Sequence, residues 1–265
     1  EDRISIQIPR YRVDVTRPSD VIEEILRIYG YNNVNTSETL ISKFSDYVSL
    51  DDHQIADRLS NQLVNLGFNE IINNPITSPD YGEISHNIKK DNRIDIINPL
   101  SKELSQMRTS LLPGALEVIA FNLNRQSRSL KLFEIGNTYQ LANEDFNEEK
   151  FLSLAISGNV IRENWNVRHQ PHLFFYSKGV IQQILEKICS IQWDESSSEM
   201  DFFSEGLNYS YMGKSLLNFG LVKKAILDKF NIDQQVLYAE LDFKHIADLA
   251  KNDKIQYQEI PKFPK

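Results

Sequence analysis

The sequence lacks most of the patterns that carry covalent chemistry, phosphate binding or membrane insertion. Cys189 is the only cysteine, which excludes an intramolecular disulfide and any thiolate-rich metal site. No run approaches the roughly 20 apolar residues that a membrane span requires, and residues 1–3 do not resemble a signal peptide. Gly206, Gly213 and Gly220 stand alone, so no glycine-rich phosphate loop is present. We therefore expect a cytoplasmic protein that has no membrane partner.

Positive charge is scarce and unevenly placed. The formal net charge of -8 at pH 7 weighs against a general nucleic-acid-binding surface, because such a surface needs clustered lysine and arginine to displace counterions from phosphates. Any contact with nucleic acid is expected to be local. No arginine follows Arg168 in the sequence.

The histidines also form no recognisable metal or catalytic-triad motif. They are His53, His86, His169, His172 and His245. The spacing of His169 and His172 would suit a pair of metal ligands, but Pro171 and Trp165 favour an exposed loop. We expect no catalytic residue and no nucleotide-binding residue in this chain.

What the sequence does contain is enough apolar residues, 41%, for a well-buried core. Residues 1–35 predict a small domain with a strand at 4–8 and an amphipathic helix at 20–29. Residues 36–50 show little periodicity and are expected to connect this domain to a larger one at 51–265.

In the larger domain, apolar periodicity predicts several strands and helices. The expected helices cover 51–66, 113–123, 178–188 and 223–230. The expected strands cover 68–77, 93–97, 130–139, 151–158, 209–219 and 236–241. These strands are spaced too irregularly for alternating βαβ units, so we expect an α+β fold in which helices flank an antiparallel sheet.

Two segments stand out as candidate sites. The first is an acidic cluster of Asp14, Asp20, Glu23 and Glu24, in which three carboxylates share one helix face and a turn through Pro18 would return Asp14 toward them. Four carboxylates suit Mg²⁺, but acidic residues in a first helical turn also complement the helix dipole without any ligand, and spacing alone favours this second interpretation.

The second candidate segment runs from Asn98 to Gly114. It combines a turn with an expected helix N-terminus, where Arg108 or Thr109 would be placed to bind a ligand. Helix capping and packing explain the same residues equally well.

Several segments, taken in order, resemble the β subunit of bacterial phenylalanyl-tRNA synthetase. Those typical of its B5 domain are Tyr11 to Asp14, Asp20 to Ile25 and Arg27 to Tyr31. Those typical of its synthetase-like core are Asn98 to Ser101, Met107 to Gly114, Asn122 to Arg125, Leu132 to Gly136, Trp165, Phe174 to Phe175, Lys178 to Gly179 and Glu240 to Asp242. Pro261 to Pro264 resembles the linker to an anticodon-binding domain. The match spans nearly the whole chain.

The resemblance implies a class II aminoacyl-tRNA synthetase-like fold preceded by part of a small, winged-helix-like B5 domain. It implies Mg²⁺ at Asp14, Asp20, Glu23 and Glu24, which reverses the preference stated above for that cluster. It also implies an (αβ)₂ tetramer in which the α subunit uses ATP to attach phenylalanine to tRNA(Phe). The helix at 51–66 takes the place of the dimerisation element, so Ile55, Leu59, Leu63 and Leu66 are expected either to contact the α subunit or to pack into the chain's own core.

The same resemblance argues against an active site in this chain. Class II synthetases hold the ATP triphosphate with an arginine in motif 2 and another in motif 3, late in the fold. The late segment Phe219 to Lys224 has no arginine, and Lys223 does not provide the planar fork of a guanidinium. Two rival interpretations remain, namely a stand-alone enzyme or metal-dependent hydrolase, and a nucleic-acid-binding module. DNA is disfavoured because phosphates would meet Asp20, Glu23 and Glu24.

Overall fold

The computed structural model describes residues 4–35, 39, 42, 50–84, 90–142, 145–159, 173–189 and 191–252. Contacts divide the chain into two units, Glu1–Val48 and Ser49–Lys265. Most of the expected connector 36–50 and the closing segment 261–264 lie outside the described residues.

The first unit is built around helix α1 (Pro18–Tyr29), which is followed by the 3-10 turn η1 (Tyr31–Asn33). Pro18 occupies the first turn, where its missing N–H costs no hydrogen bond, and Gly30 ends the helix with φ 93°. The strand expected at 4–8 is wrong, since the described part of this unit contains no strand. An extended segment becomes a strand only beside a partner that takes up its backbone hydrogen bonds.

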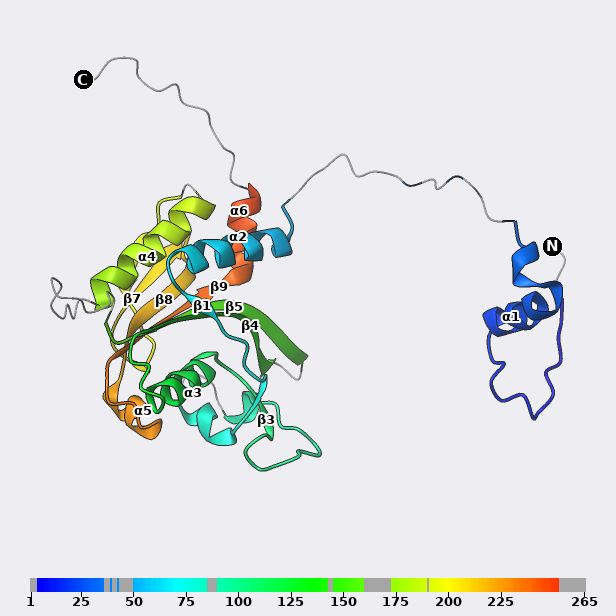
Figure 1. Cartoon of the computed structure of the whole chain (residues 1–265), viewed down its shortest axis with the longest axis horizontal. Coiled ribbons are helices and arrows are strands. Elements are labelled where there is room, and N and C mark those ends of the chain that lie inside the picture. Colours follow the sequence, from blue (N-terminus) through cyan, green and yellow to red (C-terminus); the bar gives the residue numbers. More distant parts are fainter. Residues whose placement is uncertain are drawn as a thin grey trace, which may run out of the picture. The chain divides into compact units, whose positions relative to one another are not determined.

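The second unit contains a seven-stranded sheet with the order β1-β4-β5-β9-β8-β7-β6 (Figure 1). Its strands are β1 (Asn69–Glu70), β4 (Leu130–Ala142), β5 (Asp145–Ser157), β6 (Asp194–Ser197), β7 (Phe203–Tyr211), β8 (Lys214–Val222) and β9 (Val236–Asp242). β2 (Ile76–Thr77) and β3 (Gln106–Met107) form a separate antiparallel pair. The α+β class is confirmed.

The sheet is mixed, not purely antiparallel as the sequence led us to expect. β1 pairs with β4 in parallel, whereas all the other pairs are antiparallel. The parallel pair arises because the chain reaches β4 only after the long excursion through β2, β3 and α3, which returns it in the direction of β1.

Helices cover both faces of this sheet (Figure 1). α2 (Asp52–Asn65), α4 (Leu173–Ile188) and α6 (Phe243–Asn252) lie on the first face, and α3 (Leu112–Leu123) and α5 (Lys224–Lys229) lie on the second. The short 3-10 segments are η2 (Pro79–Glu83) and η3 (Lys90–Asn92). Among the described residues, no helix combines the length and the apolar character that a membrane crossing requires.

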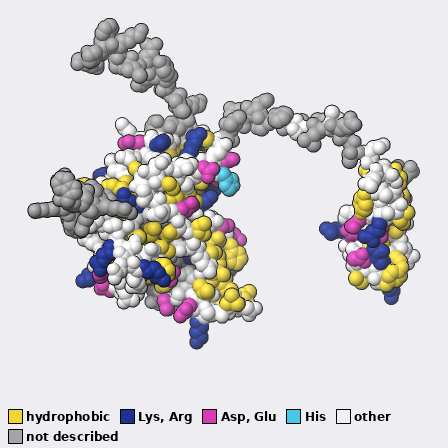
Figure 2. Space-filling view, viewed as in Figure 1, with side chains coloured by type: hydrophobic (Ala, Val, Ile, Leu, Met, Phe, Trp, Pro, Cys, Tyr) yellow, Lys and Arg dark blue, Asp and Glu magenta, His cyan; other side chains and the backbone are white. Residues whose placement is uncertain are grey.

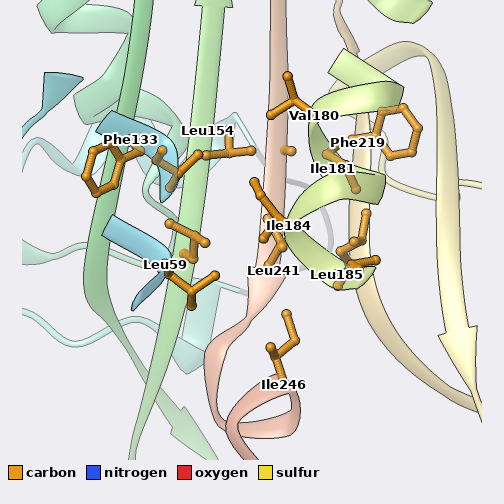
Figure 3. Packing of buried hydrophobic residues seen from close by; sticks show 14 of the residues in the cluster. Leu59, Phe133, Leu154, Val180, Ile181, Ile184, Leu185, Phe219, Leu241 and Ile246 are labelled. Atoms are coloured by element: carbon orange, nitrogen blue, oxygen red, sulfur yellow. The ribbon is translucent and has the colours of Figure 1, made fainter. Parts of the chain in front are cut away.

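The core on the first face explains the alternation of the strand sequences. Ile181 and Ile184 of α4 contact the sheet beside Leu154 and Leu241, which point to this side from neighbouring strands (Figure 3). Residues of opposite parity, such as Tyr238, point to the second face. The second face is apolar where α3 and α5 cover it and polar further along the strands, and there it forms a cavity.

Candidate functional site

The acidic cluster is organised around an arginine, Arg12. Its Nε and Nη2 atoms donate to both carboxylate oxygens of Asp14, at 3.1 and 2.9 Å, and Nη2 also donates to Oε1 of Glu24 at 2.7 Å. These hydrogen bonds hold the pKa of Asp14 and the pKa of Glu24 below their ordinary values. One guanidinium therefore joins two of the four predicted metal ligands.

The other two carboxylates have different partners. Asp20 accepts the backbone N–H groups of Thr16 and Arg17 at 2.9 and 2.8 Å, and these bonds lower the pKa of Asp20. It is therefore engaged in holding the start of α1. Glu23 is largely exposed and lies 3.8 Å from the guanidinium of Arg27, one helical turn away.

As they are arranged in this structure, the four side chains do not fit a magnesium ion. No group of three Asp, Glu, His or Cys side chains in the described part of the chain is placed to hold a metal. Arg12 lies between Asp14 and Glu24, and a divalent cation binds these carboxylates only if it displaces that guanidinium.

The unit around α1 also presents an apolar surface. None of residues 4–35 is buried, and Ile22, Ile25, Ile28 and Tyr29 are all more than half exposed. Figure 2 shows hydrophobic side chains on the outside of this unit. The helix has a strongly amphipathic sequence, but no described residue covers its apolar face.

The side chain of Arg108, the basic residue of the second candidate segment, is buried and binds other residues of this chain. Its Nη1 donates to Oε1 of Glu134 at 2.6 Å, and its Nε donates to the carbonyl of Asn137 at 2.8 Å. Glu134 Oε2 also accepts from the side chain of Asn73 at 2.7 Å. The predicted helix N-terminus is present at α3, but the charge of Arg108 is neutralised by Glu134.

The ion pair explains why residue 136 is a glycine. A side chain at Gly136 would overlap the guanidinium of Arg108, so the short segment Leu132 to Gly136 of β4 carries both the carboxylate that binds Arg108 and the glycine that admits it. The chain thus uses these residues to fix the loop before α3 onto the sheet.

A cavity of about 480 Å³ lies beside this pair, and we call it the Arg108 cavity. Asn73, Thr109 and the first turn of α3 line it. Tyr81 donates to Oε1 of Glu117 at 2.5 Å on its wall, and burial together with this carboxylate raises the pKa of Tyr81. Arg108 is its only basic lining residue among those described.

A second cavity, of about 340 Å³, lies on the second face over β4, β5, β8 and β9, and we call it the sheet cavity. Its lining includes Glu149, Glu240 and Asp242 together with Thr138 and Asn218. It adjoins a polar hollow of about 500 Å³ that shares Asn218 with it. No Lys, Arg or His among the described residues lines the sheet cavity or the hollow.

Glu240 is the chemically unusual group of the sheet cavity. Burial raises the pKa of Glu240 to about 7, and the neighbouring Glu149 adds to the effect, although the N–H of Leu111 opposes it. Sequence reasoning did not select these carboxylates. The signal was available, because Tyr238, Glu240 and Asp242 alternate along β9 and so share one face.

The four residues expected either at an interface or in the core, three in α2 and Leu66 directly after it, lie on the inner side of this segment. Ile55, Leu59 and Leu63 are buried in the core cluster, and Leu66 packs against that cluster while partly exposed. Val64, which is 56% exposed, marks the outer side of α2.

Of the five histidines, His86, His169 and His172 lie outside the described residues. His53 is exposed, and His245 donates its backbone N–H to Asp242 Oδ1 at 2.9 Å at the start of α6. The late segment Phe219 to Lys224 ends β8 and begins α5. The strand and helix that follow it, β9 and α6, contain no arginine either.

Comparison with protein families identifies two regions of the chain. Residues 1–31 match the model described as tRNA synthetase B5 domain. Residues 45–243 match the model described as phenylalanyl tRNA synthetase beta chain CLM domain.

Curated relatives extend this match to nearly the full chain. The chain is 37% identical to the phenylalanine-tRNA ligase beta subunit of Bacteroides thetaiotaomicron over 279 residues, which cover 99% of this chain and 34% of that protein. It is 36% identical to the same subunit of Bacteroides fragilis, over 98% of this chain and 33% of the relative. It is 34% identical to the same subunit of Geobacter metallireducens, over 98% of this chain and 33% of the relative. The chain thus spans about a third of the length of the curated relatives it matches.

Solved structures share the fold of about three quarters of the chain at low identity. A pyrrolysyl-tRNA synthetase from Desulfitobacterium hafniense superposes with a TM-score of 0.59 at 13% identity, over 76% of this chain and 69% of that chain. A second structure of pyrrolysyl-tRNA synthetase from this organism gives a TM-score of 0.56 at 14% identity, over 74% of this chain and 67% of that chain. At this level of identity the likeness concerns the fold alone, which is that of class II tRNA synthetases.

Proposed function

The chain belongs to the phenylalanyl-tRNA synthetase beta chain family, and we propose that it is a non-catalytic module of a two-subunit phenylalanine-tRNA ligase. In this proposal the α subunit binds ATP and joins phenylalanine to tRNA(Phe) in the cytoplasm. The present chain supports the α subunit structurally and helps to position the tRNA within an (αβ)₂ tetramer.

The observation that carries the non-catalytic assignment is the charge of the sheet cavity. Activation of an amino acid by ATP requires cationic groups against the triphosphate. The described residues that line this cavity include three carboxylates and no cation. In the Arg108 cavity, the one basic side chain is neutralised by Glu134 at 2.6 Å. A triphosphate in either place would meet carboxylates without a compensating positive charge.

ATP-pyrophosphate exchange by the purified chain tests this assignment. We expect no phenylalanine-dependent exchange above the rate without protein. Exchange that saturates with phenylalanine and ATP would mean that the chain is a self-sufficient enzyme.

We propose a domain organisation of three parts. Residues 1–35 are part of a small, winged-helix-like B5 domain, residues 51–265 form the synthetase-like core, and residues 36–50 connect the two. The match of a B5 model to residues 1–31 supports the first of these assignments. The absence of any buried residue in 4–35 is consistent with a unit whose apolar face packs against other residues in the full assembly.

For the metal, we propose that Asp14, Asp20, Glu23 and Glu24 bind Mg²⁺ only in a state in which Arg12 has left Asp14 and Glu24. When bound, the ion would supply positive charge that joins these carboxylates. Calorimetric titration with MgCl₂ tests this, with Asp20→Ala as the variant. No heat with the wild-type chain, or equal binding by the variant, would remove the metal from the proposal.

We also propose that α2 contributes to the contact with the α subunit. Ile55, Leu59 and Leu63 hold α2 on the sheet, so its outer side, which carries Val64, is the part available to a partner.

A further inference from the structure

Another cavity of the second unit lies on the first face of the sheet, where α2 meets the end of α4 and α6 (Figure 1). We call it the helix groove. Its volume of about 430 Å³ falls within the range of roughly 300–1,000 Å³ that is usual for small-ligand sites. Two contacts hold its walls: the side-chain amide of Gln62 donates to the carbonyl of Gln183 at 2.8 Å, and the ammonium of Lys251 lies 2.6 Å from a carboxylate oxygen of Asp52. The groove is therefore a preformed feature of the three helices.

The floor of the helix groove is apolar. Ile55 and Ala250 belong to the buried core of the first face, and Leu50 and Ile188 pack against that core while partly exposed. A floor of this kind favours a ligand with an apolar part, because each methylene group taken out of water contributes to binding. The floor alone does not distinguish a neutral ligand from a charged one.

The rim of the helix groove carries basic and amide side chains. Arg58, Asn61 and Asn65 are three or four positions apart in α2, so their side chains form one stripe along the groove. Lys187 lines it from the last turn of α4, where its charge also complements the helix dipole. Within the described part of the chain, none of these four side chains has a hydrogen bond or an ion pair. Their N–H groups are therefore available to a ligand.

The charge of the helix groove favours an anion. No carboxylate among the described residues lines it. Asp57 of α2 and Glu186 of α4 are neighbours of Arg58 and Lys187 in the sequence, but both are exposed and lie outside the lining. The groove is thus locally basic in a chain whose formal net charge is -8, and it is the reverse of the sheet cavity, which three carboxylates line.

The apolar floor and the basic rim together define the ligand. Two exposed cations hold a small inorganic anion only weakly, because water screens exposed ion pairs. A carboxylate on an apolar chain covers the floor and also accepts two parallel N–H bonds from a guanidinium such as that of Arg58. Nine described residues line the groove, fewer than the roughly 20–30 on each side of a standard protein-protein interface, which favours a small molecule over a polypeptide.

We propose that the helix groove binds a small amphipathic anion, an apolar chain that ends in a carboxylate. Arg58 and Lys187 supply the counter-charge, Asn61 and Asn65 donate further hydrogen bonds, and the chain lies on the floor beside Ile188. This site does not depend on which subunit carries out aminoacylation, because it rests only on residues of this chain.

Calorimetric titration of the chain tests the site with three probes, namely octanoate, pentanoate and octylammonium. We expect octanoate to bind with a Kd below about 1 mM. Each buried methylene strengthens binding by up to about fourfold, so pentanoate, which is three carbons shorter, should bind at least about tenfold more weakly. Octylammonium has the same chain and the opposite charge, and it should not bind. No binding at 10 mM octanoate, equal binding of the two carboxylates, or equal binding of octylammonium would overturn the proposal.

Charge-removing variants then locate the carboxylate. Arg58→Gln and Lys187→Gln are each expected to weaken octanoate binding about threefold, and the double variant at least about tenfold. Both positions are exposed, so these variants should keep the stability of the wild-type chain in urea. The control is Lys224→Gln, an exposed residue of α5 on the opposite face of the sheet, which should leave the Kd unchanged. An unchanged Kd in the double variant, or an equal loss in Lys224→Gln, would contradict the site.

Discussion

The guanidinium of Arg108 and the carboxylate of Glu134 form an ion pair of 2.6 Å in which the side chains are only 10% and 3% exposed. The pair joins the loop before α3 to strand β4. Arg108 lines the Arg108 cavity, and the ion pair leaves no cation among the described lining residues of that cavity free for an anionic ligand.

Replacement of Glu134 by alanine should be strongly destabilising. It leaves the buried charge of Arg108 without a counter-charge, and such changes typically cost about 3–5 kcal/mol. Urea denaturation measures the loss. The double variant Arg108→Met/Glu134→Leu is expected to recover most of the stability. A loss below about 1 kcal/mol in Glu134→Ala would show that Arg108 finds another partner or reaches water.

Two glycine-to-alanine substitutions should have opposite signs. Gly136→Ala places a methyl group against the guanidinium of Arg108 and is expected to cost about 1–3 kcal/mol. Gly179, within α4, has open space around it, and Gly179→Ala should stabilise by about 0.5–1 kcal/mol because alanine favours the helix. Thermal denaturation of both variants checks this, and the same sign for both would contradict the packing described around Arg108.

The raised pKa of Glu240 predicts how stability depends on pH. The folded state holds the Glu240 proton up to about pH 7, whereas the unfolded state releases it near the ordinary value of 4.5. The unfolded state therefore binds fewer protons in this window, and stability falls as the pH rises from about 4.5 to about 7. Glu240→Gln removes that loss, so the variant should be more stable than wild type at pH 8 by up to about 3 kcal/mol, and nearly equal at pH 4.

Chemical denaturation at pH 4 and pH 8 compares the two proteins, with Glu186→Gln as the control that should show no such difference. If the wild-type protein is as stable as Glu240→Gln at pH 8, then another group of the protein or a water molecule compensates the charge of Glu240 in the folded state.

Neighbouring residues of α2 separate the role of this helix in the core from its role at an interface. Leu63 is fully buried, so Leu63→Ala should cost about 2–5 kcal/mol. Val64 is exposed, so Val64→Ser should change stability by less than about 0.5 kcal/mol but weaken binding to the α subunit. Denaturation and a pull-down with purified α subunit measure the two effects. Unchanged binding in Val64→Ser would move the interface away from this side of α2.

The sequence predicted secondary structure best for elements that bury only one of their sides. The apolar spacing of Ile55, Leu59 and Leu63 predicts α2 closely, and Pro113 marks the first turn of α3. In α2 the side chain of Asp51 also accepts from the N–H of Gln54 at 2.7 Å, which fixes the start of the helix. In such elements, local signals and tertiary packing agree.

Other predictions were wrong because pairing partners cannot be read from local pattern. The expected strand 209–219 is a hairpin of β7 and β8, turned by Met212 and Gly213 at φ values of 49° and 78°. The expected strand 93–97 contains only an isolated bridge at Asp95. Helix α6 was not predicted at all, because its sequence follows β9 directly, without a turn.

For the candidate sites, sequence located residues but not their partners. Nothing in the pattern around Asp14 and Glu24 indicated that Arg12 would bind both of them. Arg108 or Thr109 was a candidate for binding a ligand, with capping and packing as an equal alternative, and the sequence did not indicate that Glu134 on a distant strand would neutralise Arg108. The carboxylates of the sheet cavity come from two strands, and only the register of β5 with β9 brings them together.

The most direct test of the account is aminoacylation of tRNA with phenylalanine by the separately purified α subunit, with and without the full-length β chain that contains this sequence. The account predicts that activity develops only when both subunits are mixed and that the β chain alone has none. Activity of the β chain alone would contradict the non-catalytic assignment and the charge argument on which it rests.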